Sequence, residues 1–254
     1  DRAGDGRARL RLVLREARPL AGPSRRPATL AVYDFSLLSR SVPESLGARP
    51  LSALTCVVFD TETTGLEVGS GDRIVQIAAL RIVNGRVIET ESFETLVDPG
   101  RPIPASSTKI HRITDTMVAG APTIAVAGRR FHGFCEGAVL VAHNAPFDIG
   151  FLKAAAGEIG AAFDHPVLDT VLLSAVVFGA SAAHSLDALA ERLGIAIAPE
   201  DRHQAMGDAR ATARAFLGLV RMLEAMGVVT FADAVRECRR HGRLLEDLNS
   251  REHV

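Results

Sequence analysis

The first regular pattern of apolar and polar positions predicts three strands. Residues 55–59 form a short apolar run that ends at a turn rich in threonine and glycine, which predicts a buried central strand. Residues 73–83 and 86–97 predict two further strands, and the pair Asn84 and Gly85 between them is a strong hairpin signal. The sheet is therefore predicted to begin with three antiparallel strands.

Later segments alternate between strand and helix. Residues 138–142 predict a strand and residues 147–156 a helix, whereas periodicity alone allows residues 167–177 to be either. Amphipathic helices are predicted between the N-cap Ser185 and Gly194, at residues 205–226, and at residues 231–248. Strands first, then alternating helix and strand, predict an α/β domain with a mixed sheet over about residues 52–227.

The two ends of the chain differ from this central region. Residues 1–51 are rich in arginine at first and then in proline and serine, with weak periodicity, which predicts an N-terminal arm or linker. A short amphipathic segment at residues 10–18 is either a packing arm or a basic contact for nucleic acid or a partner. Residues 228–254 are expected to form a C-terminal helical extension.

Composition places the chain among globular proteins. Hydrophobic residues make up 47% and charged residues 23%, and the formal net charge is −1, so a phosphate-bearing partner would need a local binding site. Three cysteines without paired spacing are typical of a reducing compartment. The sequence contains no apolar stretch long enough for a membrane span or signal peptide. We therefore expect a cytoplasmic protein without a membrane partner.

Four carboxylates lie near the ends of predicted elements. Asp60 and Glu62 occupy alternate positions at the end of the first strand, so the pleat turns both to one side. Taken alone, this pair is more typical of a cap or a solvated strand edge than of a functional site. Asp148 follows another predicted strand and Asp208 lies at a helix start. Four neighbouring carboxylates repel one another unless positive charge compensates them. Divalent cations that prefer oxygen ligands, such as Mg²⁺ and Mn²⁺, supply that charge.

Three short segments carry a resemblance to a known family. Residues 59–65 (FDTETTG), 143–148 (HNAPFD) and 203–208 (HQAMGD) resemble, in the same order, the three motifs of the DEDDh exonucleases. Within that superfamily the chain is most similar to the proofreading epsilon subunit of bacterial DNA polymerase III and its stand-alone relatives, over about residues 54–225. Residues 110–114 add support, although Arg112 stands where the family usually has glycine.

The resemblance implies a fold and a metal site. The fold is a ribonuclease-H-like α/β domain whose mixed five-stranded sheet is flanked by helices. Two divalent ions, Mg²⁺ or Mn²⁺, would be held by Asp60, Glu62, Asp148 and Asp208, with Asp60 shared between the ions and Asp148 acting through water. The resemblance makes His203 the general base.

The resemblance also implies contacts with the substrate. The expected substrate-binding residues are Thr63, Thr64, Leu66, His111 and Asn144. Glu62 and the Thr63 backbone would hold the terminal 3′-hydroxyl, and Leu66 would contact the last base unless it is an ordinary core leucine. His143 and Asp169 are expected to be mainly structural.

The implied activity is metal-dependent 3′→5′ removal of nucleoside 5′-monophosphates from DNA 3′ ends, in proofreading or repair. A DNA polymerase or repair protein is then a possible partner. Two other functions stay open: a 3′→5′ exoribonuclease on short or structured RNA, and a catalytically idle module that binds nucleic acid. The intact set of acids and histidine speaks against the idle module, while DNA is preferred over RNA by resemblance alone.

Overall fold

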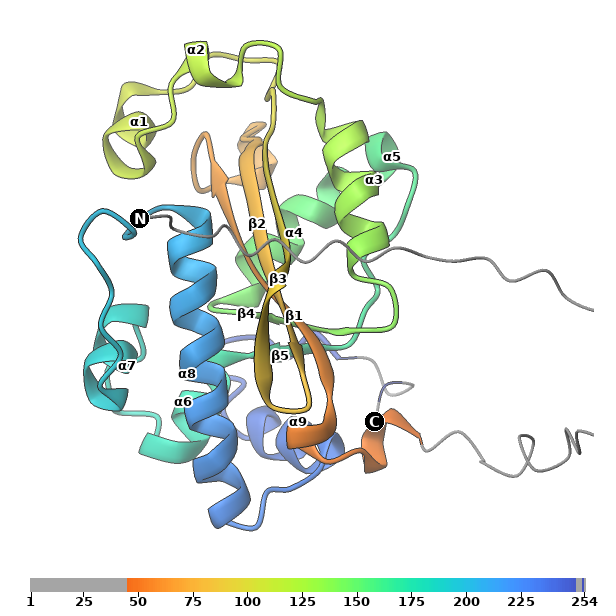
Figure 1. Cartoon of the computed structure of the whole chain (residues 1–254), viewed down its shortest axis with the longest axis vertical. Coiled ribbons are helices and arrows are strands. Elements are labelled where there is room, and N and C mark those ends of the chain that lie inside the picture. The colour runs from red at the N-terminus through yellow and green to blue at the C-terminus, as the bar shows by residue number, and fades with distance from the viewer. Residues whose placement is uncertain (1–44, 250–252, 254) are drawn as a thin grey trace, which may run out of the picture. The chain divides into compact units, whose positions relative to one another are not determined.

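A five-stranded mixed sheet forms the centre of the computed structural model, which describes residues 45–249 and 253 (Figure 1). The strand order is β3-β2-β1-β4-β5, with antiparallel pairing from β3 to β1 and parallel pairing from β1 to β5. The strands are β1 (Thr55–Thr63), β2 (Ile74–Val83), β3 (Arg86–Leu96), β4 (Val139–Ala142) and β5 (Val167–Asp169). The predicted antiparallel start is therefore confirmed.

The hairpin between β2 and β3 follows from its two turn residues. Asn84 and Gly85 have φ values of 49° and 69°, which a two-residue turn requires when it matches the twist of its strands. Val83 then pairs with Arg86 across the turn. This turn sets the pairing of β2 with β3 up to a register shift between Leu80 and Arg81.

Helices cover both faces of the sheet, and alternation along β1 assigns each residue to one face. Cys56 and Val58 pack in the cluster that contains residues of α6 and α8, whereas Val57 and Phe59 pack against residues of α3 and α4. Figure 1 shows α6, α7 and α8 on one side of the sheet and α3, α4 and α5 on the other. Even-numbered positions of β1 therefore face α8.

The α-helices on the α8 side are α6 (Thr170–Phe178), α7 (Leu186–Leu193), α8 (Ala205–Ala225) and α9 (Phe231–Arg239), and those elsewhere are α1 (Ala105–His111), α2 (Asp115–Val118), α3 (Ile124–Phe134), α4 (Ala145–Ala154) and α5 (Ala156–Ile159). Short 3-10 turns are η2 (Leu46–Ala48), η3 (Leu51–Ala53) and η4 (Val68–Ser70). Ser185 caps α7 by accepting from the Ala188 N–H, and Gly194 ends it at φ 67°, as predicted.

Two expectations needed correction. Residues 167–177 are neither strand nor helix alone, because β5 ends at Asp169, whose side chain accepts from the Val171 N–H and starts α6. The helix predicted over residues 231–248 is wrong in length, since α9 ends at Arg239 and a turn follows. The residues after Arg239 continue the apolar pattern without forming a helix. Side-chain contacts hold this segment in place, including an Arg239–Asp247 ion pair of 2.9 Å.

The described ends of the chain share the core of the sheet domain. Leu51 and Phe231 are buried in the same cluster as α6 and α8, and the Leu51 N–H donates to the Val229 carbonyl oxygen. Packing is thus continuous across the boundaries expected at residues 51 and 228. Residues 1–44, with the amphipathic segment at 10–18, lie outside the described residues. Within the described part, no helix has the length and apolar composition to cross a membrane. The three cysteines are buried and unbridged.

Candidate active site

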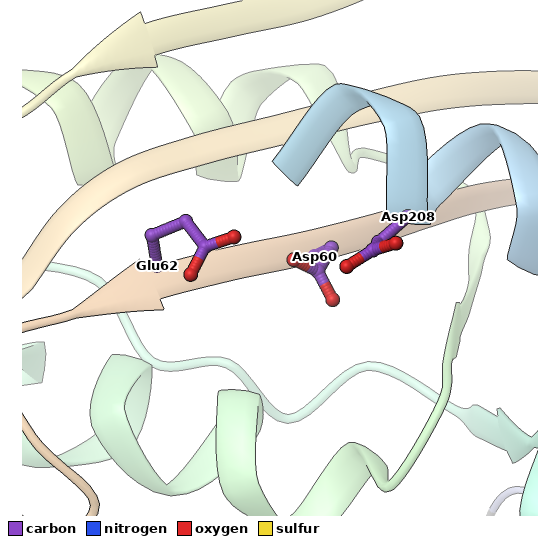
Figure 2. A group of neighbouring side chains, drawn as sticks. All are labelled: Asp60, Glu62 and Asp208. Atoms are coloured by element: carbon purple, nitrogen blue, oxygen red, sulfur yellow. The ribbon is translucent and has the colours of Figure 1, made fainter. Parts of the chain in front are cut away.

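Three acidic side chains meet where β1 ends beside the start of α8. Asp60 and Glu62 are even-numbered residues of β1 and face α8, while Asp208 lies in the first turn of that helix. One carboxylate oxygen from each lies within 4.8 Å of the others. Figure 2 shows the three carboxylates drawn together from the strand and the helix. The expectation that the pleat turns Asp60 and Glu62 to one side is confirmed.

The environment of this acid cluster disfavours negative charge. Burial, followed by the charges of neighbouring acids, raises the pKa of Asp60 well above its usual range and that of Glu62 to about 8. Burial also raises the pKa of Asp208. Clustered carboxylate oxygens whose negative charges repel one another form a donor set that fits a hard divalent cation.

Asp148 approaches the same strand from the opposite layer. It lies 3% exposed in α4, and its Oδ1 accepts from the Thr61 N–H at 3.0 Å and the Thr61 hydroxyl at 2.6 Å. The negative charge of Asp148 raises the pKa of Asp60, so the two carboxylates are electrostatic neighbours. Sequence reasoning missed Thr61, although its place between Asp60 and Glu62 turns it to the face from which Asp148 comes.

His203 lies in the turn that leads into α8. Its backbone has a φ of 56° and its side chain is exposed. The preceding residue, Arg202, was missed by sequence reasoning. Its Nη1 donates to Asp208 Oδ1 at 2.5 Å and its Nη2 to Asp187 Oδ2 at 2.7 Å. The Arg202 guanidinium therefore reaches into the acid cluster from the turn that contains His203.

The turn after β1 is closed by its own threonines. The Thr63 hydroxyl donates to the Gly65 carbonyl oxygen at 2.6 Å, and the Thr64 hydroxyl donates to Asp72 Oδ1 at 3.0 Å. A Cβ on Gly65 would lie 2.2 Å from the Asp72 carboxylate, so a larger residue would displace the Asp72 side chain. Leu66 is 80% exposed, so the alternative of a core leucine is wrong. Substrate contacts by these residues stay predictions.

His111 ends α1 with a defined ring orientation. It is 3% exposed, and its Nδ1 accepts from the Ile113 N–H at 3.0 Å, which leaves the hydrogen of the neutral ring on Nε2. Burial lowers the His111 pKa. Arg112, at the family's usual glycine position, has a φ of 65° and donates to the carbonyl oxygens of Pro199 at 3.3 Å and Glu200 at 3.0 Å. The segment preceding His203 is thereby tied to α1.

Residues around Asp148 hold the start of α4. Asn144 is exposed, has a φ of 68° and precedes the helix, so it can still meet a substrate. His143 Nδ1 bonds the Thr170 hydroxyl at 2.8 Å, and burial lowers its pKa to about 4. Asp169 Oδ2 accepts from the Ala145 N–H at 2.5 Å. These hydrogen bonds support the structural roles expected for His143 and Asp169, which stay predictions.

The chain is similar to known exonucleases and to DNA polymerase III proteins. The family model RNase_T, described as "Exonuclease", matches residues 57–216, and the chain belongs to this exonuclease family. A DNA polymerase III subunit epsilon-like protein of Rhodobacter capsulatus is 59% identical over 98% of this chain and 36% of its own. A PolC-type DNA polymerase III of Caldanaerobacter subterraneus is 39% identical over 70% of this chain and 12% of its own.

A solved structure titled exonuclease X in complex with 5′ overhanging duplex DNA has the same fold. It is 27% identical with a TM-score of 0.56, covering 72% of this chain and 99% of that one. The ribonuclease-H-like fold expected from the motifs is therefore confirmed. The chain spans about a third of the epsilon-like relative and about an eighth of the PolC-type relative.

Proposed function

We propose that this domain is a two-metal 3′→5′ exonuclease that releases nucleoside 5′-monophosphates from DNA 3′ ends. The observation that carries the proposal is the convergence of Asp60, Glu62 and Asp208, with one carboxylate oxygen from each within 4.8 Å of the others. Membership of the exonuclease family supports the reaction class.

Asp60, Glu62 and Asp208 would hold Mg²⁺ or Mn²⁺, and Asp148 would complete the set from the α4 side. When bound, the ions supply charge stabilisation at the phosphoryl oxygens and lower the pKa of a water molecule. Burial raises the pKa values of these carboxylates, so protons compete with the metal ions for the same oxygen atoms. Hydrolysis should therefore require added metal and stop with a chelator.

The chain's own residues bind the 3′ end and handle the proton. Glu62 and the Thr63 backbone hold the 3′-hydroxyl, and exposed Leu66 contacts the terminal base. His203 accepts a proton during the attack on the terminal phosphodiester, since imidazole is the commonest general base. Its exposed position beside Asp208 gives it access to both the acid cluster and solvent.

DNA is the proposed substrate, and a DNA polymerase or a repair protein is the proposed partner. The structure titled exonuclease X holds duplex DNA with a 5′ overhang, and the relatives above bear DNA polymerase III names. Proofreading or repair are the processes in which such an activity would act. RNA remains an outcome of the test, because one additional hydrogen-bond partner is enough to accept a 2′-hydroxyl.

The test is digestion of matched single-stranded DNA, duplex DNA and RNA oligonucleotides labelled at the 5′ end. With Mg²⁺ or Mn²⁺ we expect ladders that shorten from the 3′ end, release of 5′-monophosphates, and a block by a 3′-phosphate, whose charge the Glu62 pocket opposes. Shortening from the 5′ end or cleavage of closed circles would contradict the proposal. Preferential digestion of RNA would favour the exoribonuclease alternative.

The His203→Ala variant tests the assignment of the general base. We expect turnover to fall by about 10²–10⁴-fold, with a smaller effect on substrate binding, because only proton transfer is lost. Wild-type turnover in this variant would show that another group accepts the proton.

A further inference from the structure

An arginine side chain already forms an ion pair with one carboxylate of the acid cluster. Arg202 bridges Asp208 at 2.5 Å and Asp187 at 2.7 Å, and its side chain is 20% exposed. Over residues 45–249, it is the only lysine or arginine that forms an ion pair with Asp60, Glu62, Asp148 or Asp208. Its charge also lowers the pKa values of Asp60 and Glu62.

The position of this guanidinium conflicts with metal binding. The same Asp208 carboxylate that bonds Arg202 belongs to the trio proposed to hold a divalent ion. A guanidinium cannot lose its proton in a protein, so its charge cannot be removed to admit another cation. Two cations on one carboxylate repel each other, and the repulsion is strong where water is excluded.

We infer that Arg202 is a resident counter-cation that competes with the divalent ion for Asp208 and lowers the metal affinity of the site. Arg202 gives up Asp208 when the ion binds, and Asp187, whose side chain is 67% exposed, retains the guanidinium. In the metal-free protein, Arg202 thus compensates the negative charge of the acid cluster. This inference rests on the proposed metal site and adds a residue that sets its affinity.

The decisive measurement is calorimetric titration of the full chain with Mg²⁺, without nucleic acid. The pH should lie above 8, because the Glu62 pKa is raised to about 8 and protons then interfere least. We expect Arg202→Gln to bind Mg²⁺ about tenfold more tightly than wild type, which corresponds to about 1.4 kcal/mol. Arg192→Gln is the matched control, because Arg192 lies on α7, bonds the Ala183 carbonyl oxygen and contacts none of the acids. It should leave the affinity unchanged.

A double-mutant cycle tests the role of Asp187. Asp187→Asn alone should weaken Mg²⁺ binding, because Arg202 then keeps only Asp208 as a partner. In the Arg202→Gln background the same substitution should have a much smaller effect. Equal effects in both backgrounds would show that Asp187 acts directly on the ion, and would overturn its role as the second anchor.

Thermal melting gives a readout independent of affinity. In chelator, Arg202→Gln should melt below wild type, because Asp208 loses its partner, and saturating Mg²⁺ should remove most of that difference. Arg202→Lys keeps the charge without the two-pronged contact and should fall between the two in affinity. Equal or weaker Mg²⁺ binding by folded Arg202→Gln would overturn the inference alone. Absence of Mg²⁺ binding by wild type would overturn the proposed metal site itself.

Discussion

Asp60 and Asp208 belong to the same acid cluster but have different neighbours. Asp60 faces other acids, and burial and their charges raise its pKa. Asp208 faces the same acids but also bonds Arg202 at 2.5 Å. Without metal, removing charge at Asp60 relieves repulsion, whereas removing it at Asp208 breaks an ion pair. Loss of either charge should be equally harmful to catalysis, but the two losses should have different effects on the stability of the fold.

We therefore predict opposite stability changes for two isosteric substitutions. Asp60→Asn should keep or raise the free energy of unfolding measured in chelator. Asp208→Asn should lower it by about 1–3 kcal/mol, because the ion pair with Arg202 becomes a hydrogen bond to a neutral amide oxygen. Both variants should lose almost all turnover. Urea unfolding by circular dichroism measures the stabilities, and equal destabilisation by both would contradict the contrast.

The same acids give the metal-free protein a characteristic pH dependence. Burial raises the folded-state pKa of Glu62 to about 8 and that of Asp148 above its usual range, while the unfolded values are about 4. Between those values the folded state binds more protons, so the free energy of unfolding falls as pH rises. His143, with a pKa lowered to about 4, opposes this trend only below about pH 6.5.

Stability in chelator is thus expected to fall from about pH 6.5 to about pH 8. Glu62→Gln should flatten the decline, because it removes one of the groups that titrate there. Saturating Mg²⁺ should also flatten it by compensating the ionised acids. Urea unfolding across this range provides the measurement, and stability that rises with pH would show that these pKa directions are wrong.

At the level of elements, β1 and α8 assemble the site, and both were predictable from sequence. A continuous apolar run predicted the strand, a helical apolar period predicted the helix, and the motif positions placed Asp60, Glu62 and Asp208 near the ends of these two segments. The short helices α1 and α2 were missed because few turns give little periodic signal, and α3 was missed because Gly128 and Gly133 lower its helix propensity. The Arg202–Asp187 pair was also beyond sequence reasoning, since it depends on how α7 packs beside the turn before α8.

The close approach of that turn to α8 depends on Gly207. A Cβ at this position would lie 2.0 Å from the Asp201 carbonyl oxygen, which is backbone and cannot swing away. We predict that Gly207→Ala displaces the turn and with it His203, and lowers turnover by about 10²-fold. Overpacking should cost about 1–3 kcal/mol of stability. Steady-state kinetics and melting measure both effects.

Gly133→Ala is the control for this prediction. Gly133 lies in α3, where a Cβ would meet nothing within 4 Å, so alanine should be neutral or stabilising by about 0.5–1 kcal/mol. Its turnover should match wild type. If Gly207→Ala were as active as Gly133→Ala, the close approach of the turn to α8 would not position the catalytic histidine.

The whole molecule builds one core on the α8 side from segments far apart in sequence. Phe231, Ala234 and Val235 of α9 are completely buried with residues of α6 and α8. Further along, the Asn249 side chain binds edge strand β5 as a backbone would, because it donates to the Val167 carbonyl oxygen at 2.7 Å and accepts from its N–H at 2.8 Å. The C-terminal residues therefore cover the core and protect a sheet edge.

This arrangement predicts that the C-terminal segment is indispensable for folding. Deleting residues 228–254 strips α9 from the core, so we expect an insoluble chain or one without a cooperative melting transition. Asn249→Ala should cost about 1–2 kcal/mol, because it leaves both Val167 backbone groups to water. Glu246→Ala, at an exposed position in the same segment, is the control and should melt like wild type. A shortened chain that melts cooperatively at the wild-type temperature would show that these residues are an appended extension.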